Sequence, residues 1–131
     1  PSYEEGLEQA IAYLIGQKKR VCLIAQVPPL ESSFLKYLEL THLMNHFFPR
    51  SISVEELLTY DQDFLDEKLQ PMRTIIERLE SKFPALYVWH PEDHIHTGTH
   101  EGIPCYSDDN HLNIQGARYL TPYFDYPLEA E

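Results

Sequence analysis

Two short apolar segments constrain the fold of this chain more than any other feature. Residues 21–27 read VCLIAQV and residues 85–89 read ALYVW. Both runs are nearly continuous rather than alternating, which is the pattern of a parallel strand that is covered on both faces. Pro28 and Pro29 end the first run. The sequence therefore predicts an α/β fold with two parallel strands.

The segments before and after these strands show the apolar spacing of helices. Apolar residues recur at helical spacing over residues 2–15, 31–48, 63–81 and 114–124. We expect Gly16 to be a left-handed C-cap, Pro71 to kink or divide its helix, and Asn113 to cap the last helix. A capping box at residues 53–56 predicts one further helix start, and residues 103–106 predict a short extended piece.

The loop before the last helix carries an aspartate and a histidine in one turn, Asp108 and His111. A histidine that works as a general base needs a fixed tautomer and a stabilised positive form, and a carboxylate on its second ring nitrogen provides both. The spacing therefore suits an acid–base pair. The same residues would also suit a loop in which an aspartate caps the helix and His111 lies on the surface.

The order D-x-x-H-L-N-x-x-G at residues 108–116 resembles the last conserved block of the SGNH (or GDSL) hydrolases. The resemblance is strongest to the SGNH domains that are fused to membrane O-acyltransferases. Residues 20–28, which end in Val-Pro, are similar to the family's late central strand. Residues 60–80 and 85–89 fit its linking helix and last strand. Spacing in the family makes Asp108, rather than Asp109, the residue that orients His111.

This resemblance implies a three-layer α/β/α, flavodoxin-like fold with a parallel sheet. It covers only the second half of the family's domain, so residues 1–131 are expected to be the C-terminal portion of one SGNH-like domain. The family's blocks with the serine nucleophile and the oxyanion-hole residues have no counterpart here, and Ser32 and Ser33 match neither. The chain begins at Pro1 rather than Met. We therefore expect an upstream part of the natural chain to supply the nucleophile and the fragment alone to be nearly inactive.

By resemblance, the natural protein is a serine O-acyl esterase or O-acyltransferase that needs no cofactor. It is expected to move small acyl groups, most often acetyl, on an acylated or acceptor carbohydrate of the cell envelope, outside the cytoplasmic membrane. His90 ends the second strand beside the expected site, so we expect it to contact the substrate. Because a two-stranded sheet is marginal alone, its free edge predicts pairing with the upstream part or with a second copy in a homo-oligomer.

A histidine-rich segment offers an alternative reading. Residues 90–100 contain four histidines and two acids, with Cys105 nearby. His94, His96 and His100 are candidate ligands for zinc, nickel or copper, which would make the chain a noncatalytic metal-binding or interaction module. The spacing matches none of the common zinc sites, so a polar loop without metal is the favoured interpretation.

Charge and composition indicate which classes of binding partner are unfavourable for this chain. The formal net charge of −11 disfavours nucleic acid and anionic lipid surfaces. No apolar run approaches the roughly 20 residues of a membrane-spanning helix, so no such segment is expected. The two cysteines, Cys22 and Cys105, are compatible with a disulfide or with two free thiols, and free thiols are favoured.

Overall fold

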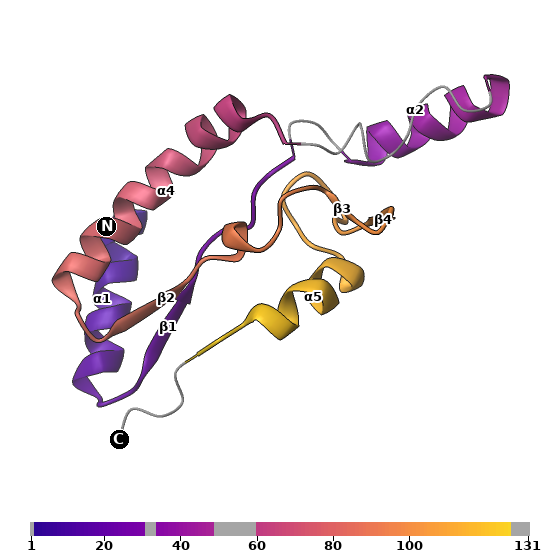
Figure 1. The fold of residues 1–131 in the computed structure, drawn as a ribbon. Helices are drawn as coiled ribbons and strands as arrows, with labels where there is room; N and C mark the ends of the chain where they lie inside the picture. Colours follow the sequence, from indigo (N-terminus) through magenta and orange to yellow (C-terminus); the bar gives the residue numbers. More distant parts are fainter. Residues whose placement is uncertain (1, 31–33, 49–59, 127–131) are drawn as a thin grey trace.

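The structure is a computed structural model that describes residues 2–30, 34–48 and 60–126. It is a mixed helix-and-strand fold with a small parallel sheet (Figure 1). The elements are α1 (Tyr3–Gly16), β1 (Val21–Ile24), α2 (Phe34–Phe47), α4 (Gln62–Lys82), β2 (Leu86–Trp89), η1 (Pro91–Asp93), β3 (Thr99–His100), β4 (Ile103–Pro104), α5 (Ile114–Leu120) and η2 (Thr121–Tyr123). The capping box predicted at residues 53–56 lies outside the described residues.

Strands β1 and β2 pair in parallel, as the two apolar runs predicted. The register joins Val21 to Leu86 at one end and Ile24 to Trp89 at the other. One more hydrogen bond, from Ala25 N to Trp89 O at 2.9 Å, extends the pairing. The prediction that the first strand reaches residue 27 was wrong, because its partner strand ends at Trp89, where the chain turns into η1.

One face of the β1–β2 sheet is covered by α1 and α4, which lie on the same side of it in Figure 1. Ile11 of α1, Leu79 of α4 and Leu86 of β2 form the buried centre of this packing. Partly buried apolar side chains surround the centre: Leu7, Ile15, Val21, Leu23, Ile75, Phe83 and Val88. Apolar burial of this kind is the main stabilising contribution to the fold.

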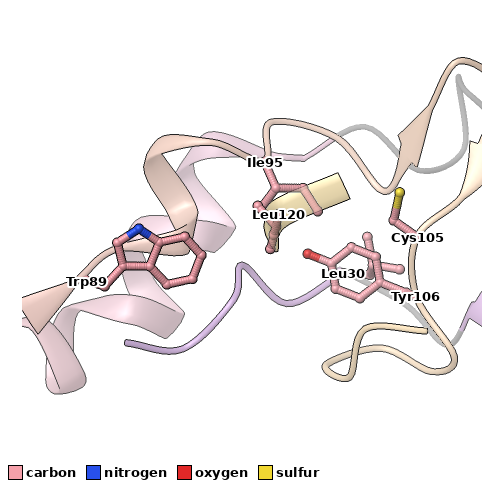
Figure 2. Close-up of a cluster of buried hydrophobic side chains, with 6 residues drawn as sticks. All are labelled: Leu30, Trp89, Ile95, Cys105, Tyr106 and Leu120. Carbon is pink, nitrogen blue, oxygen red and sulfur yellow. The ribbon is translucent and has the colours of Figure 1, made fainter. Parts of the chain in front are cut away.

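A second buried cluster joins the sheet to the loops that follow its two strands. Figure 2 shows its members: Leu30, Trp89, Ile95, Cys105, Tyr106 and Leu120. Tyr106 is fully buried at 0% exposure. Cys22 and Tyr87, which alternate with the residues facing α1 and α4, pack against the cluster from the sheet. Both Cys22 and Cys105 are free thiols, the state that the composition favoured.

The ends of α1 show one prediction that was wrong. Ser2 caps the helix and forms a capping box with Glu5. Gly16 is not the left-handed C-cap: it is the last helical residue, and the backbone turns at Lys18, whose φ is 57°. The helix extends through Gly16 because Gln17 N donates to Tyr13 O at 3.0 Å.

Two prolines have different effects on the later helices. Pro71 does not divide α4, which is unbroken from Gln62 to Lys82. Pro71 and Glu67 are both exposed, so the carbonyl that loses its intrahelical donor lies on the solvent side. The last helix was predicted to reach residue 124, but α5 ends at Leu120 and continues as η2. Pro122 has no N–H to donate to the preceding turn, so the α-helix ends before it.

The extended piece predicted at residues 103–106 is strand β4 followed by a single bridge between Tyr106 and Leu112. It pairs with β3 in an antiparallel hairpin that the sequence did not predict. Helix α2 projects from the rest of the structure (Figure 1) and ends at Phe47, one residue before the predicted end. Residues 31–33 of that predicted helix lie outside the described residues. None of the described helices is long and apolar enough to cross a membrane.

Candidate active site

The loop between β4 and α5 holds Asp108 and His111 together, as predicted. The Asp108 Oδ2 atom lies 2.8 Å from His111 Nδ1. Its other oxygen, Oδ1, accepts from the backbone N–H groups of Asn110 at 2.9 Å and His111 at 2.7 Å. Because both carboxylate oxygens are engaged, the carboxylate is fixed in position on the imidazole ring.

This arrangement sets the protonation of the pair. The backbone N–H of Asn110, followed by the His111 ring, holds the pKa of Asp108 below its usual value. An ionised Asp108 only accepts hydrogen bonds, so the geometry assigns the proton to His111 Nδ1 and leaves Nε2 as an acceptor. The Asp108 side chain is 44% exposed and that of His111 is 73% exposed. The pair is therefore open to a reacting group from outside the loop.

Two neighbours of the pair, Ser107 and Asp109, form hydrogen bonds that hold the loop in place. Asp109 is exposed, and its backbone oxygen accepts from Leu30 N at 2.7 Å, which ties the loop to the segment after β1. Ser107 bonds the local backbone as predicted, since its Oγ donates to His111 O at 3.2 Å. Its hydroxyl proton is therefore engaged within the loop. The geometry thus brings Asp108, and neither of these two residues, to the His111 ring.

Asn113 joins the loop to α5 and to β4. Its Oδ1 accepts from Gly116 N at 2.9 Å, which is the predicted helix cap. Its Nδ2 donates to Pro104 O at 2.8 Å and to Tyr106 O at 3.2 Å. The first turn of α5 approaches the backbone so closely that a Cβ at Gly116 would lie 2.2 Å from Cys105 O. A glycine is required at position 116 by this contact.

Sequence reasoning missed two tyrosines that support the loop. The Tyr106 hydroxyl donates to Pro28 O at 2.6 Å and lies 2.7 Å from the Tyr60 hydroxyl. Burial raises the pKa of both phenols, so both stay protonated. Tyr60 Oη also lies 3.2 Å from Thr97 O. These bonds connect the loop of His111 to the Val-Pro segment after β1. The one sequence signal for them was that Tyr106 ends a predicted extended piece.

An apolar hollow of about 290 Å³ is lined by residues of the parallel sheet and of the C-terminal segment from Leu112 onward. Leu112, which follows His111 in the chain, is one of its lining residues. The sheet contributes Ile24 and Trp89, and the C-terminal segment contributes Leu120 and Phe124. Ile24 is 57% exposed, although it lies in a strand. The hollow therefore adjoins the loop of His111 through Leu112.

His90 lies outside the apolar hollow that Leu112 lines. It follows β2, and its Nδ1 is 3.8 Å from Glu92 Oε1. It lines a small hollow beside α4 with Arg73, whose Nε is 3.6 Å from the same Glu92 oxygen. The structure therefore does not bring His90 into the hollow that Leu112 lines, and its contact with substrate stays a prediction.

The three histidines of the metal alternative are not gathered into one site. The His94 ring stacks between those of Trp89 and Tyr123, at centroid distances of 6.0 and 4.9 Å. The His100 ring stacks on Tyr119 at 4.0 Å, and His96 is exposed. Within residues 2–30, 34–48 and 60–126, no three or more His, Cys, Asp or Glu side chains are arranged to hold a metal ion.

A comparison with models of known protein families identifies the family of this chain. The family model described as "SGNH domain (fused to AT3 domains)" matches residues 1–125. No curated protein and no solved structure matches the chain. The family match includes both strands of the parallel sheet and the loop of Asp108 and His111. The chain belongs to the family of SGNH domains that are fused to AT3 domains.

Proposed function

We propose that this chain supplies the acid–base pair of a serine-dependent O-acyl esterase or O-acyltransferase. His111 is the general base, and Asp108 orients its ring. Membership of the SGNH family makes this an acyltransferase- or esterase-related domain. The observation that carries the proposal is the 2.8 Å contact of Asp108 Oδ2 with His111 Nδ1, which leaves Nε2 exposed as a proton acceptor.

The reaction needs a serine nucleophile, which in this proposal comes from outside residues 1–131. In the first step, His111 Nε2 takes the proton of the serine Oγ as that oxygen attacks the ester carbonyl. Collapse of the tetrahedral intermediate breaks the ester bond, and the imidazolium returns the proton to the leaving alkoxide. Water or an acceptor hydroxyl then attacks the acyl-enzyme by the same route. Asp108 stabilises the imidazolium in both halves of the reaction.

The serine belongs to an upstream part of the natural chain. Ser107 Oγ is bonded to His111 O, and Ser32 and Ser33 lie outside the described residues. The description of the family as fused to AT3 domains is consistent with a larger chain. In that chain residues 1–131 are the C-terminal portion of one SGNH domain.

The complete domain is a three-layer α/β/α sandwich in this proposal. Support comes from the two buried clusters, which pack against opposite side-chain sets of β1 and β2. Within the described residues the sheet has two strands in the order β1–β2, which leaves an edge of β1 for an upstream strand. Pairing of two copies through that edge is the competing arrangement.

The substrate class in this proposal rests on the resemblance to SGNH domains fused to membrane O-acyltransferases. The domain transfers or removes a small acyl group, most often acetyl, on a carbohydrate of the cell envelope, outside the cytoplasmic membrane. The apolar hollow beside Leu112 is open to such a group. No chemical step in this proposal requires a metal or an organic cofactor, because the imidazole and the serine carry out the proton transfer and the attack.

Hydrolysis of p-nitrophenyl acetate tests the proposal in three proteins: this chain, the chain extended to its native N-terminus, and the extended form with His111→Ala. We expect activity only in the extended form with His111 intact, and a loss of about 10³-fold in kcat/KM without it. An extended protein that is as inactive as the chain alone would refute the proposal.

Two adjacent aspartates provide a matched control. Asp108→Asn in the extended form removes the negative partner of the ring and should lower kcat/KM by about 10²-fold or more. Asp109→Asn changes the neighbouring side chain but keeps the backbone bond to Leu30, so its rate should stay near the wild-type value. Equal losses in the two variants would contradict the assigned role of Asp108.

A further inference from the structure

A second hollow, separate from the one beside Leu112, lies at the β3–β4 hairpin. Its volume is about 370 Å³, and we call it the hairpin hollow. Thr99 and His100 contribute from β3 and Glu101 from the turn of the hairpin. Tyr119 contributes from α5, and His96 from the segment between β2 and β3. The hollow thus combines an aromatic wall with several polar side chains, and the acid–base pair uses none of them.

The aromatic wall is held in position by its neighbours. The His100 and Tyr119 rings stack with centroids 4.0 Å apart and planes inclined by 27°. The Tyr119 hydroxyl donates to His94 O at 3.0 Å. Tyr123 meets the Tyr119 ring edge-on at 5.6 Å. A ring fixed on three sides loses little conformational entropy when a ligand stacks against it, so the wall is preorganised for binding.

The polar groups of the hollow are available to a ligand. Within the part of the chain that the structure describes, the side chains of His96, Thr99 and Glu101 make no hydrogen bond or ion pair, and the His100 ring makes only its stacking contact. Together they offer a carboxylate acceptor, two imidazoles and a hydroxyl around one space. No lysine or arginine lines the hollow, so it has no fixed positive charge that would attract an anion.

The backbone of the hairpin supports the same assignment. Glu101 and Gly102 occupy the two turn positions with φ values of 50° and 75°. Glycine, asparagine and aspartate are favoured where φ is positive, and glutamate is not. A non-glycine residue held in a left-handed conformation is a reason to look for a function of its side chain. The turn places that side chain at the hairpin hollow.

We propose that the hairpin hollow is a carbohydrate subsite that binds an uncharged pyranose ring. An outer face of the Tyr119 and His100 stack contacts the apolar face of the ring, while Glu101, Thr99 and His96 bond its hydroxyls. The bond from Asn113 Nδ2 to Pro104 O, at 2.8 Å, fixes this hairpin to the loop of His111. The identity of the bound sugar as part of the acylated glycan rests on the proposed function, whereas the binding itself does not.

Titration of the ¹⁵N-labelled chain with cellotriose and with triacetylchitotriose, followed by heteronuclear NMR, tests the subsite. Backbone resonances of residues 96–103 and of Tyr119 should shift with at least one sugar at millimolar concentration. His100→Ala should weaken binding about fivefold, the loss expected for one aromatic contact. Glu101→Gly should also weaken binding, although it relieves the unfavourable backbone conformation and should leave the fold at least as stable.

Lys18→Gly is the matched control, because Lys18 is the other non-glycine residue with positive φ in the described segments and lies at the end of α1. It should relieve the same conformation without changing sugar binding. Absence of shifts at the hairpin with both sugars, or shifts that His100→Ala and Glu101→Gly leave unchanged, overturns the subsite. In the extended protein, His111→Ala should bind the sugars normally and lose hydrolysis. Hydrolysis that survives His111→Ala while sugar binding is unchanged would count against the proposed function alone.

Discussion

Gly116→Ala should destabilise the protein, although alanine is the better helix former. In an ordinary helix the change gains about 0.5–1 kcal/mol of stability. At position 116 the new Cβ would lie 2.2 Å from Cys105 O and 2.9 Å from Leu112 Cδ2. The first of these atoms belongs to the backbone and cannot rotate away, so α5 has to move from β4.

The magnitude follows from what that movement breaks. Overpacking of this kind costs about 1–3 kcal/mol. Moving the helix start also lengthens the 2.9 Å bond from Asn113 N to Cys105 O and the 2.8 Å bond from Asn113 Nδ2 to Pro104 O, each worth about 1 kcal/mol. Subtracting the gain in helix propensity leaves a net loss of about 2–4 kcal/mol.

Urea unfolding followed by the fluorescence of Trp89, the only tryptophan, measures this loss. Gly6→Ala is the control, because Gly6 lies inside α1 and a Cβ there would meet nothing within 4 Å. It should raise the free energy of unfolding by about 0.5–1 kcal/mol. If Gly116→Ala is as stable as Gly6→Ala, the close contact between α5 and β4 does not exist as described.

Two further predictions concern the loop of His111. The pKa of Asp108 is held below its usual value in the folded protein, so Asp108 stabilises the fold above its unfolded pKa of about 3.9, and this contribution is lost as the pH falls through the lower folded pKa. Urea unfolding at several pH values should therefore show a stability difference between wild type and Asp108→Asn that narrows in acid, and a difference that is constant with pH would contradict this. Tyr106→Phe should cost about 1–3 kcal/mol by thermal or urea unfolding, because it leaves Pro28 O without its buried donor. Tyr13→Phe, at a side chain that is 68% exposed, should change little, and an equal effect of the two variants would exclude the buried bond.

Most of the features that sequence reasoning predicted correctly are local in the chain, and the pairing of β1 with β2 is the exception. Asp108 meets His111 three residues later, and Asn113 caps α5 through Gly116, again three residues later. Spacing alone predicts such contacts, since a single turn brings these side chains together. The parallel pairing of β1 and β2 was also predicted, because continuous apolar runs are typical of strands covered on both faces.

The features that were missed depend on distant partners. Tyr106 reaches Pro28 across 78 residues and Tyr60 across 46, and no spacing rule connects these positions. The end of β1 depends on where β2 ends, which the sequence of β1 does not contain. The β3–β4 hairpin was missed because Glu101 at a left-handed turn position is not a typical turn signal.

The pair of Asp108 and His111 combines a buried support with an exposed imidazole ring. Tyr106 and Cys105 are almost fully buried, whereas the His111 side chain is 73% exposed. In water the attraction between a carboxylate and an imidazolium is weak, and it increases when water is excluded. If His111 is the general base, Asp108 therefore contributes most of its effect only after another part of the domain covers the pair. Expressed as free energies, the loss of kcat/KM that Asp108→Asn causes in the extended protein should then be much larger than its effect on the free energy of unfolding of this chain. Free-energy changes of similar size would mean that the pair has only a structural role.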